Sequence, residues 1–312
     1  MRMETSGILI VDKPPQLSSA QLISRIKRIS GISKIGHSGT LDPMATGVMV
    51  CGVNQATRLF QFFLNRPKKY VAVVTLGVET DTLDATGNIV ASRPFDTVSE
   101  QSVRDACRQF EGEIDQIPPA YSALKHKGTP LYKYARRGTP VIKPSRKILI
   151  SGIRILGINL PKVQMEVECS SGTYIRTLCA DIGDVLGCGG HLSALKRIEC
   201  GGYNIRDALS LEDIASHRSL ETLAGNLISM SDALPEMPMA IADTGLAEKI
   251  KHGKLLSAID IPADASMEAT PSTGNGGFPP VKIVDRDNRL LAVVRRDENQ
   301  DRYNYCCVFC NP

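Results

Sequence analysis

Residues 36–48 read Gly36-His37-Ser38-Gly39-Thr40-Leu41-Asp42-Pro43-Met44-Ala45-Thr46-Gly47-Val48. The stretch holds one carboxylate, Asp42, among three glycines and a proline. Glycine permits sharp turns and proline restricts the backbone, so the stretch predicts a tight turn that aims the Asp42 side chain. An ordinary alternative is that Asp42 caps a helix whose first residue is Pro43.

The overall composition is that of an ordinary soluble globular protein, with 42% hydrophobic and 22% charged residues among 312. This length allows one large domain and a small one, or two domains of ordinary size. The apolar run Ile8–Val11 ends at Asp12, so it is too short for a signal-peptide core or a membrane span. We therefore expect a cytoplasmic protein that does not bind membranes.

The cysteines and the glycine patterns bear on metals and cofactors. Nine cysteines, an odd number, form no framework with histidines, which predicts free thiols in a reducing compartment. Cys307 and Cys310 have metal or redox spacing, but one such pair does not complete a zinc site, so no metal is expected. Neither a Walker pattern nor a dinucleotide glycine fingerprint occurs, and we expect no cofactor.

A basic segment covers residues 118–147. It contains eight Lys or Arg residues and no Asp or Glu, although the whole chain carries a net charge of only +4. Tyr121, Tyr132 and Tyr134 are interleaved with these charges. A run of charge alone is usually a solvated surface, whereas basic residues mixed with aromatics suit phosphate neutralisation and base stacking. The segment therefore favours a nucleic-acid partner.

Hydrophobic periodicity predicts a mixture of strands and helices without a βαβ rhythm. Strands are expected at residues 69–76 and 163–169, helices at 99–111 and 174–186, and a hairpin at 281–284 and 290–294. We expect an α+β domain around a largely antiparallel sheet, followed after about residue 235 by a small β-rich domain. The Pro/Gly/Ser/Thr-rich residues 262–280 are expected to form a mobile loop.

The stretch around Asp42 resembles the signature of the TruB family of tRNA pseudouridine-55 synthases. Further segments are similar to that family in the same order, at residues 7–14, 68–70, 118–125, 169–177 and 195–197. Two positions depart from the family pattern, since Ser171 and Lys196 stand where a basic residue and an arginine, respectively, are common. Neither departure touches the residues that would carry the chemistry.

The resemblance implies a fold, a domain division and an activity. Residues 1–235 would form a pseudouridine-synthase core with a largely antiparallel mixed sheet and a basic RNA-gripping insertion at about 118–147. Residues 236–312 would form a PUA-like RNA-binding domain. The enzyme would isomerise uridine 55 in the TΨC loop of tRNA, by cleaving the C1′–N1 bond and rejoining the base through C5. It would work as a monomer that requires no protein partner.

The resemblance also assigns the site residues. Asp42 would be the catalytic carboxylate, which either attacks C1′ or takes a sugar proton. Arg176 would pair with Asp42 and keep the pKa of that carboxyl low. Residues expected to contact the flipped uridine or the opened loop are Tyr70, Tyr174, Arg176, Leu195 and His37. Residues expected to contact the RNA backbone are Lys13, Lys125, Lys127, Arg136 and Arg137.

Three other functions compete with this one. A non-catalytic RNA-binding protein would have no need for Asp42, Tyr70 and Arg176 together. A carboxylate glycosidase normally uses two acids, and no second acid stands in the matching segments. A relative that works with guide RNAs is the third, and the absence of long basic tails favours a stand-alone enzyme instead.

Overall fold

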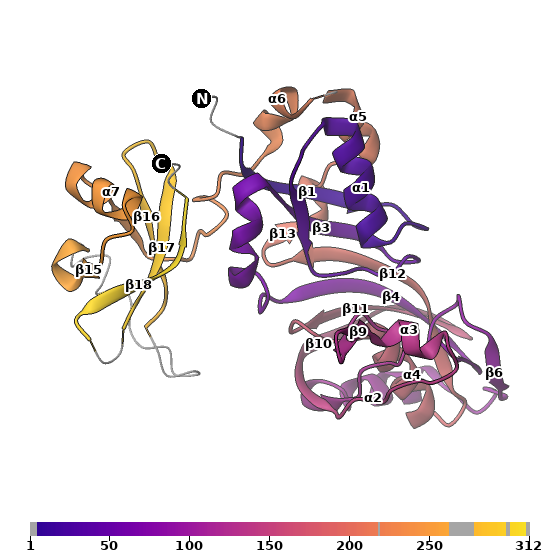
Figure 1. The fold of residues 1–312 in the computed structure, drawn as a ribbon. Helices are drawn as coiled ribbons and strands as arrows, with labels where there is room; N and C mark the ends of the chain where they lie inside the picture. Colours follow the sequence, from indigo (N-terminus) through magenta and orange to yellow (C-terminus); the bar gives the residue numbers. More distant parts are fainter. Residues whose placement is uncertain (1–4, 218, 262–277, 298–299, 310–312) are drawn as a thin grey trace.

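The computed structural model describes residues 5–217, 219–261, 278–297 and 300–309. Figure 1 shows a large body built on a central sheet and a smaller body beside it. The large body contains a nine-stranded sheet and the smaller one a five-stranded sheet. The predicted α+β fold, with a β-rich part at the C-terminal end of the chain, is therefore confirmed.

In the large sheet, strands that are far apart in the sequence lie side by side. The path along it is β1 (Gly7–Lys13), β3 (Thr46–Val53), β12 (Gly190–Cys200), β4 (Lys68–Leu76), β11 (Lys162–Cys169), β10 (Arg146–Asn159) and β7 (Gly112–Gln116). In addition, β2 (Ile35–Ser38) pairs with β3, and β13 (Tyr203–Asn204) pairs with β12. Only the β12–β3 pair is parallel among these, so the sheet is mixed and largely antiparallel as predicted.

Two groups of helices pack against this sheet, one toward each end of the large body (Figure 1). At one end lie α1 (Ser19–Ser30) and α5 (Leu211–His217), and at the other lie α2 (Glu100–Arg108) and α4 (Ile175–Val185). Their apolar side chains join one core with the sheet, to which Leu22, Val103, Leu178 and Ala72 contribute. The candidate site lies over residues 70 of β4 and 195 of β12.

Helix ends follow local capping rules, and this corrects one boundary. Ser99 caps α2 with its hydroxyl, so the helix begins at Glu100. The helix ends at Arg108 and not at residue 111, because the next amides bond three residues back, as in a tighter turn. Gly187 adopts a left-handed conformation just after α4, which is common for a glycine that follows a helix.

Shorter elements complete the large body. They are η1 (Asn54–Phe62), β5 (Val78–Thr80), β6 (Ile89–Ser92), β8 (Lys125–His126), β9 (Thr129–Pro130), α3 (Leu131–Ala135), η2 (Ile205–Asp207), α6 (Leu220–Leu223) and η3 (Ala224–Asn226). The strands β5 and β6 pair with each other, and so do β8 and β9. The basic segment thus consists of a small hairpin, a short helix and the start of β10.

The small sheet has the order β14 (Met239–Ile241), β16 (Val281–Val284), β17 (Leu290–Arg296), β18 (Arg302–Val308) and β15 (Leu256–Ser257), with α7 (Thr244–Lys251) and η4 (Ala258–Asp260) beside it. The predicted hairpin is present as β16 and β17. Most of the predicted 262–280 loop, namely residues 262–277, and Cys310 lie outside the described residues. The eight cysteines within the described residues are free, as expected.

The two sheets share a hydrophobic cluster. Val284, Leu290 and Val293 of the small sheet belong to the same cluster as Ile8 of β1 and Val50 of β3. Alternate residues of β1 and β3 instead enter the main core, so these two strands are buried on both faces. A buried ammonium adds a polar link, since Lys282 Nζ donates to the carbonyls of Ser231 (3.0 Å) and Leu234 (2.9 Å).

A chain truncated after Leu234 is therefore expected to be markedly less stable than the full chain. Burying each large aliphatic side chain contributes about 1.5–3 kcal/mol, so uncovering one face of β1 and β3 should cost more than about 3 kcal/mol of unfolding free energy. Urea denaturation of the two proteins measures this difference. Equal unfolding free energies would show that the shared cluster contributes little.

Candidate active site

The Asp42 turn connects β2 to β3 and is not a helix start. The amide of Ala45 donates to the Asp42 carbonyl (3.1 Å), and the chain enters β3 at Thr46. The alternative in which Asp42 caps a helix is therefore wrong, because the extended pairing of β3 follows within four residues. Gly39 and Gly47 both adopt positive φ angles in this turn (90° and 102°), a conformation that suits glycine.

Buried polar groups hold the part of the turn that precedes Asp42. The hydroxyl of Ser19, at the start of α1, donates to the Leu41 carbonyl (3.0 Å) and accepts from the Leu41 amide (2.9 Å). Arg197 Nη2 donates to the Gly39 carbonyl (3.1 Å). Because the backbone just before Asp42 is tied to the scaffold, the Asp42 side chain has a defined direction.

Lys13 is a structural residue under this turn, and the prediction that it contacts RNA is wrong. Its side chain is fully buried, and its ammonium donates to the carbonyls of Pro14 (2.9 Å), Leu17 (2.6 Å) and Pro43 (3.3 Å). Burial lowers the pKa of Lys13 to about 8, against the opposing attraction of Asp42. A buried ammonium with three carbonyl partners has no surface left for a phosphate.

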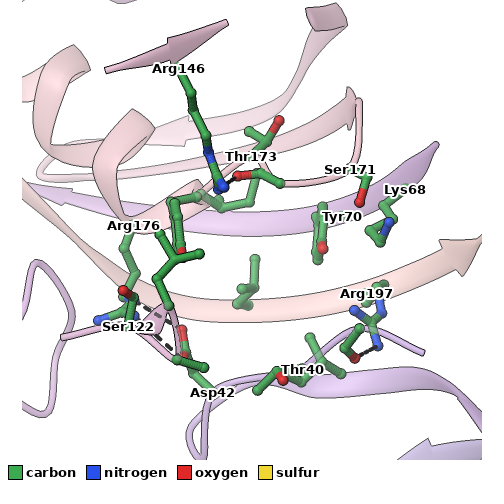
Figure 2. Close-up of a pocket in the computed structure, with 18 residues that line it drawn as sticks. Thr40, Asp42, Lys68, Tyr70, Ser122, Arg146, Ser171, Thr173, Arg176 and Arg197 are labelled. Atoms are coloured by element: carbon green, nitrogen blue, oxygen red, sulfur yellow. Dashed lines mark hydrogen bonds and ion pairs between the residues drawn. The ribbon is translucent and has the colours of Figure 1, made fainter. Parts of the chain in front are cut away.

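Arg176 pairs with Asp42, as the sequence predicts. Its Nε lies 2.9 Å from Asp42 Oδ2, and its Nη2 donates to Asp42 Oδ1 over 3.4 Å (Figure 2). The guanidinium also donates to the carbonyls of Thr82 (3.0 Å) and Tyr121 (2.7 Å), and its Nη1 lies 3.5 Å from Asp84 Oδ2. Only 5% of the Arg176 side chain is exposed. The pair therefore differs from exposed surface ion pairs, which contribute little to stability.

The pKa of Asp42 shifts in the direction opposite to the one expected from its arginine partner. Burial of the carboxyl, which keeps about a third of its side chain exposed (34%), raises the pKa above the ordinary value. Arg176 and Lys13 oppose that rise, while the nearby charge of Asp84 adds to it. The expectation that Arg176 leaves the pKa low is therefore wrong, because it considered the pair without its desolvation or the second carboxylate.

A cavity of about 340 Å³ opens over β4 and β12 beside this ion pair. Five predicted residues line it together, and they are Asp42, Tyr70, Tyr174, Arg176 and Leu195 (Figure 2). Tyr70 and Leu195 come from the two middle strands of the sheet, Tyr174 and Arg176 from the start of α4, and Asp42 from the opposite wall. The chain thus brings segments from residues 42 to 195 to one concave site.

The two tyrosines of the cavity are held differently. Tyr70 is buried, which raises the pKa of its phenol to about 12, so the hydroxyl stays protonated at neutral pH. The backbone of Tyr174 exchanges two hydrogen bonds with the Gln116 amide (2.7 and 3.0 Å), and the Arg146 guanidinium lies 4.9 Å from the centre of its ring. Within the described residues, no hydrogen bond joins the Tyr174 hydroxyl to Asp42 or Arg176.

A second cavity of about 900 Å³ adjoins the first, and Asp42 and Arg176 border both. His37 lines the second one together with Arg136 of the basic segment. Burial and the charge of Arg197 lower the pKa of His37, so its ring is neutral at pH 7. His37 Nδ1 is buried and has no hydrogen-bond partner among the residues that the structure covers.

The four other predicted RNA contacts lie on the exposed surface of the basic segment. They are Lys125, Lys127, Arg136 and Arg137. None of the four pairs with an Asp or Glu of the described chain, and the Arg136 guanidinium lies 5.4 Å from the ring centre of Tyr132. The segment therefore presents uncompensated positive charge at the mouth of the second cavity.

Sequence reasoning missed three residues that shape this site. Asp84 is 4% exposed and is fixed by Thr82 and Thr86 as well as by Arg176. The threonine-rich turn after β5 was the sequence feature that could have indicated a fixed aspartate. It does not distinguish Asp84 from Asp81, which lies in the same turn. Ser19 gave no signal and Arg197 stood only within the matching segment 195–197, because their partners are backbone groups of a distant segment.

Known proteins resemble this chain along most of its length. Residues 27–175 match the model for the N-terminal domain of TruB family pseudouridylate synthases, and residues 176–234 match that for the tRNA pseudouridylate synthase B C-terminal domain. A tRNA pseudouridine synthase B from Syntrophus aciditrophicus is 44% identical over 93% of this chain and 90% of its own length. The one from Syntrophotalea carbinolica is 46% identical over 75% and 76%, respectively.

A solved structure is also similar. The crystal structure of a Cbf5-Nop10-Gar1 complex contains a chain with a TM-score of 0.70 and 26% identity, over 93% of this chain and 78% of that one. The matches in sequence and fold make this protein an enzyme of the pseudouridylate synthase class. Within that class, the chain belongs to the TruB family. No helix within the described residues is long and apolar enough to cross a membrane.

Proposed function

We propose that this enzyme isomerises uridine 55 in the TΨC loop of tRNA to pseudouridine, with Asp42 as its catalytic carboxylate. The single observation that carries the proposal is the Asp42–Arg176 ion pair at the wall of a concave cavity. The relatives named tRNA pseudouridine synthase B support the choice of substrate. The enzyme acts as a cytoplasmic monomer that needs no cofactor and no protein partner.

The chemistry requires an ionised carboxylate next to the ribose. Asp42 either attacks C1′ or removes a sugar proton, and Arg176 stabilises its charged form against the cost of burial. The Tyr70 ring stacks on the uracil, and Leu195 closes the pocket so that the detached base stays in place while it turns. With a pKa of about 12, the Tyr70 hydroxyl is a poor proton acceptor, which favours stacking as its role.

Access to the cavity requires the target nucleotide to leave the stack of its loop. Flipping one nucleotide costs a few kcal/mol, which contacts with the opened loop must offset. His37 and Arg136 line the second cavity and are suited to hold that loop. Tyr174 forms part of the wall of the first cavity. The small β-rich body at residues 236–312 acts as a PUA-like module that adds RNA affinity.

The competing functions fit the site less well. Among the described residues that line the first cavity, Asp42 is the sole carboxylate, whereas a glycosidase needs two. Asp84 does not serve as the second acid, since it is buried and engaged by Arg176, Thr82 and Thr86. An RNA-holding protein without activity would gain nothing from a buried ion pair, which is costly to desolvate.

The proposed function is tested by the position at which pseudouridine forms in tRNA. Full-length protein incubated with unmodified tRNA and no additive is expected to form pseudouridine at position 55. Mapping the modified nucleotides along the tRNA reads the result directly. No pseudouridine, or pseudouridine only at other positions, would contradict the proposal.

The basic segment is expected to carry much of the tRNA affinity. Replacing Lys125, Lys127, Arg136 and Arg137 together by Ala should weaken binding and flatten its dependence on salt. Each lost phosphate contact reduces the slope of log affinity against log salt by about 0.7–0.9. The matched control replaces Arg104 and Arg108 of α2, which pair with Glu100 and Asp105. An unchanged slope in the fourfold variant would place the RNA elsewhere.

A further inference from the structure

Arg197 occupies a central place between two parts of the proposed catalytic machinery. It lies on β12, the strand between β3 and β4, directly opposite Tyr70 on one side and Gly47 on the other. Leu195, two residues earlier, points into the cavity, and residues two apart on a strand share a face. Arg197 therefore starts from the same face as the cavity walls, between the predicted stacking tyrosine and the Asp42 turn (Figure 2).

The Arg197 guanidinium forms hydrogen bonds with groups of the protein itself. Its Nε donates to the Val48 carbonyl (2.7 Å) and its Nη2 to the Gly39 carbonyl (3.1 Å), while its backbone lies directly opposite Tyr70 on β4. Only 1% of the residue is exposed, so it offers little surface to RNA. It therefore acts through the groups that it holds.

Gly47 leaves the space that this arrangement needs. A Cβ atom at position 47 would come within 2.2 Å of the Arg197 carbonyl oxygen, a distance that real Cβ atoms do not reach. The glycine thus lets β3 and β12 approach closely at the point where the turn ends. That approach allows one side chain to reach Val48 and Gly39, which lie on either side of Asp42.

The charge of Arg197 is costly for stability alone. No Asp or Glu of the described chain forms an ion pair with it, and its partners are neutral oxygens. A buried cation without a counter-ion pays a desolvation penalty that an apolar side chain of similar size would avoid. A planar guanidinium, however, donates from separate nitrogens in fixed directions, whereas an apolar side chain donates nothing and a lysine has a single, freely rotating ammonium.

We propose that Arg197 is a positioning residue that fixes the Asp42 turn relative to Tyr70 across the substrate cavity. Its guanidinium holds the backbone before Asp42 at Gly39 and the backbone after it at Val48, and the pairing of β12 with β4 sets it directly opposite Tyr70. The role in catalysis rests on the proposed function, whereas the hold on the turn does not. The target uridine would meet a carboxylate and a stacking ring whose separation is set by one residue.

The test compares three variants. Arg197→Met removes the hydrogen bonds, and Arg197→Lys keeps the charge but has a single, freely rotating ammonium in place of separate nitrogens in fixed directions. Lys282→Met is the matched control, because Lys282 is also a buried cation bonded to two carbonyls, but at the junction with the small sheet. Thermal unfolding of each variant shows how much of any effect is lost stability.

At saturating tRNA, Arg197→Met is expected to lower kcat about 100-fold, the effect of a displacement of about 1 Å, and Arg197→Lys about 10-fold. The dissociation constant of tRNA should stay within about threefold of wild type in both, because the residue does not face RNA. The kcat of Lys282→Met should equal that of wild type. Wild-type kcat in either Arg197 variant, or an equal fall in the control, would overturn the proposal.

Amide hydrogen exchange supplies a readout that needs no activity. Arg197→Met is expected to speed exchange in residues 36–48, while Lys282→Met leaves that segment unchanged. If the wild-type protein forms no pseudouridine, the proposed function fails, and the exchange of residues 36–48 still decides whether Arg197 holds the turn. Unchanged exchange in Arg197→Met would overturn the inference.

Discussion

Asp42→Asn is expected to form no detectable pseudouridine, while its affinity for tRNA stays within a few-fold of wild type. Asparagine keeps the size of the side chain, and the turn around it is held by Ser19 and Arg197 through the backbone. A neutral amide can neither attack C1′ nor take a sugar proton. Binding rests on the exposed basic segment, which the substitution does not touch. Quantifying pseudouridine and tRNA binding on the same preparation checks both expectations.

The control for this experiment is Asp81→Asn, which changes an exposed carboxylate in the turn between β5 and β6. That variant should retain wild-type activity. Mass spectrometry of Asp42→Asn excludes deamidation back to aspartate. Residual turnover in a preparation free of aspartate would contradict the assignment of Asp42.

Arg176→Gln is expected to have the second largest effect, on both activity and stability. The substitution leaves Asp42 and the buried Asp84 without the cation that lies between them. Removing one partner of a buried ion pair typically costs about 3–5 kcal/mol. We expect a loss of stability of this order at neutral pH, with a large fall in kcat. Arg176→Lys, which keeps the charge, should be less affected.

The pH dependence of Arg176→Gln has a defined sign. Arg176 opposes the rise in the pKa of Asp42, so its removal raises that pKa further. Because activity needs the ionised carboxylate, the acid limb of the pH–rate profile should move to higher pH. The loss of stability should be greatest above the raised pKa and shrink as pH falls through it, because the protonated carboxyl needs no cation. A limb that does not move would show that Arg176 leaves the titration of Asp42 unaffected.

Much of the fold and site could be predicted because the signals were local. Three glycines and a proline marked the turn at Asp42, and strict alternation marked β11. Tyr70 and Leu195 lie on neighbouring strands and line the same cavity, as the resemblance to the family implied. The Asp42–Arg176 pair was expected from the resemblance to the family, whereas the place of Arg176 in the first turn of α4, where the helix dipole disfavours a cation, does not identify its partner.

The predictions that failed concern residues whose roles depend on burial or on contacts with distant backbone groups. Lys13 follows a strand and precedes a proline, which says nothing about the three carbonyls that enclose its ammonium. The direction of the pKa shift at Asp42 depends on desolvation and on Asp84, neither of which appears in a motif. Arg197 was visible only as part of a matching segment, because its partners are carbonyl groups about 150 residues away.

The most direct measurement of the central claim is a product balance in a single turnover. Wild-type protein in excess over unmodified tRNA is incubated without additives, and both pseudouridine at position 55 and free uracil are quantified. An isomerase that keeps the detached base in its cavity predicts nearly one pseudouridine per tRNA and no uracil. Release of uracil, or bound tRNA that stays unmodified, would contradict the account.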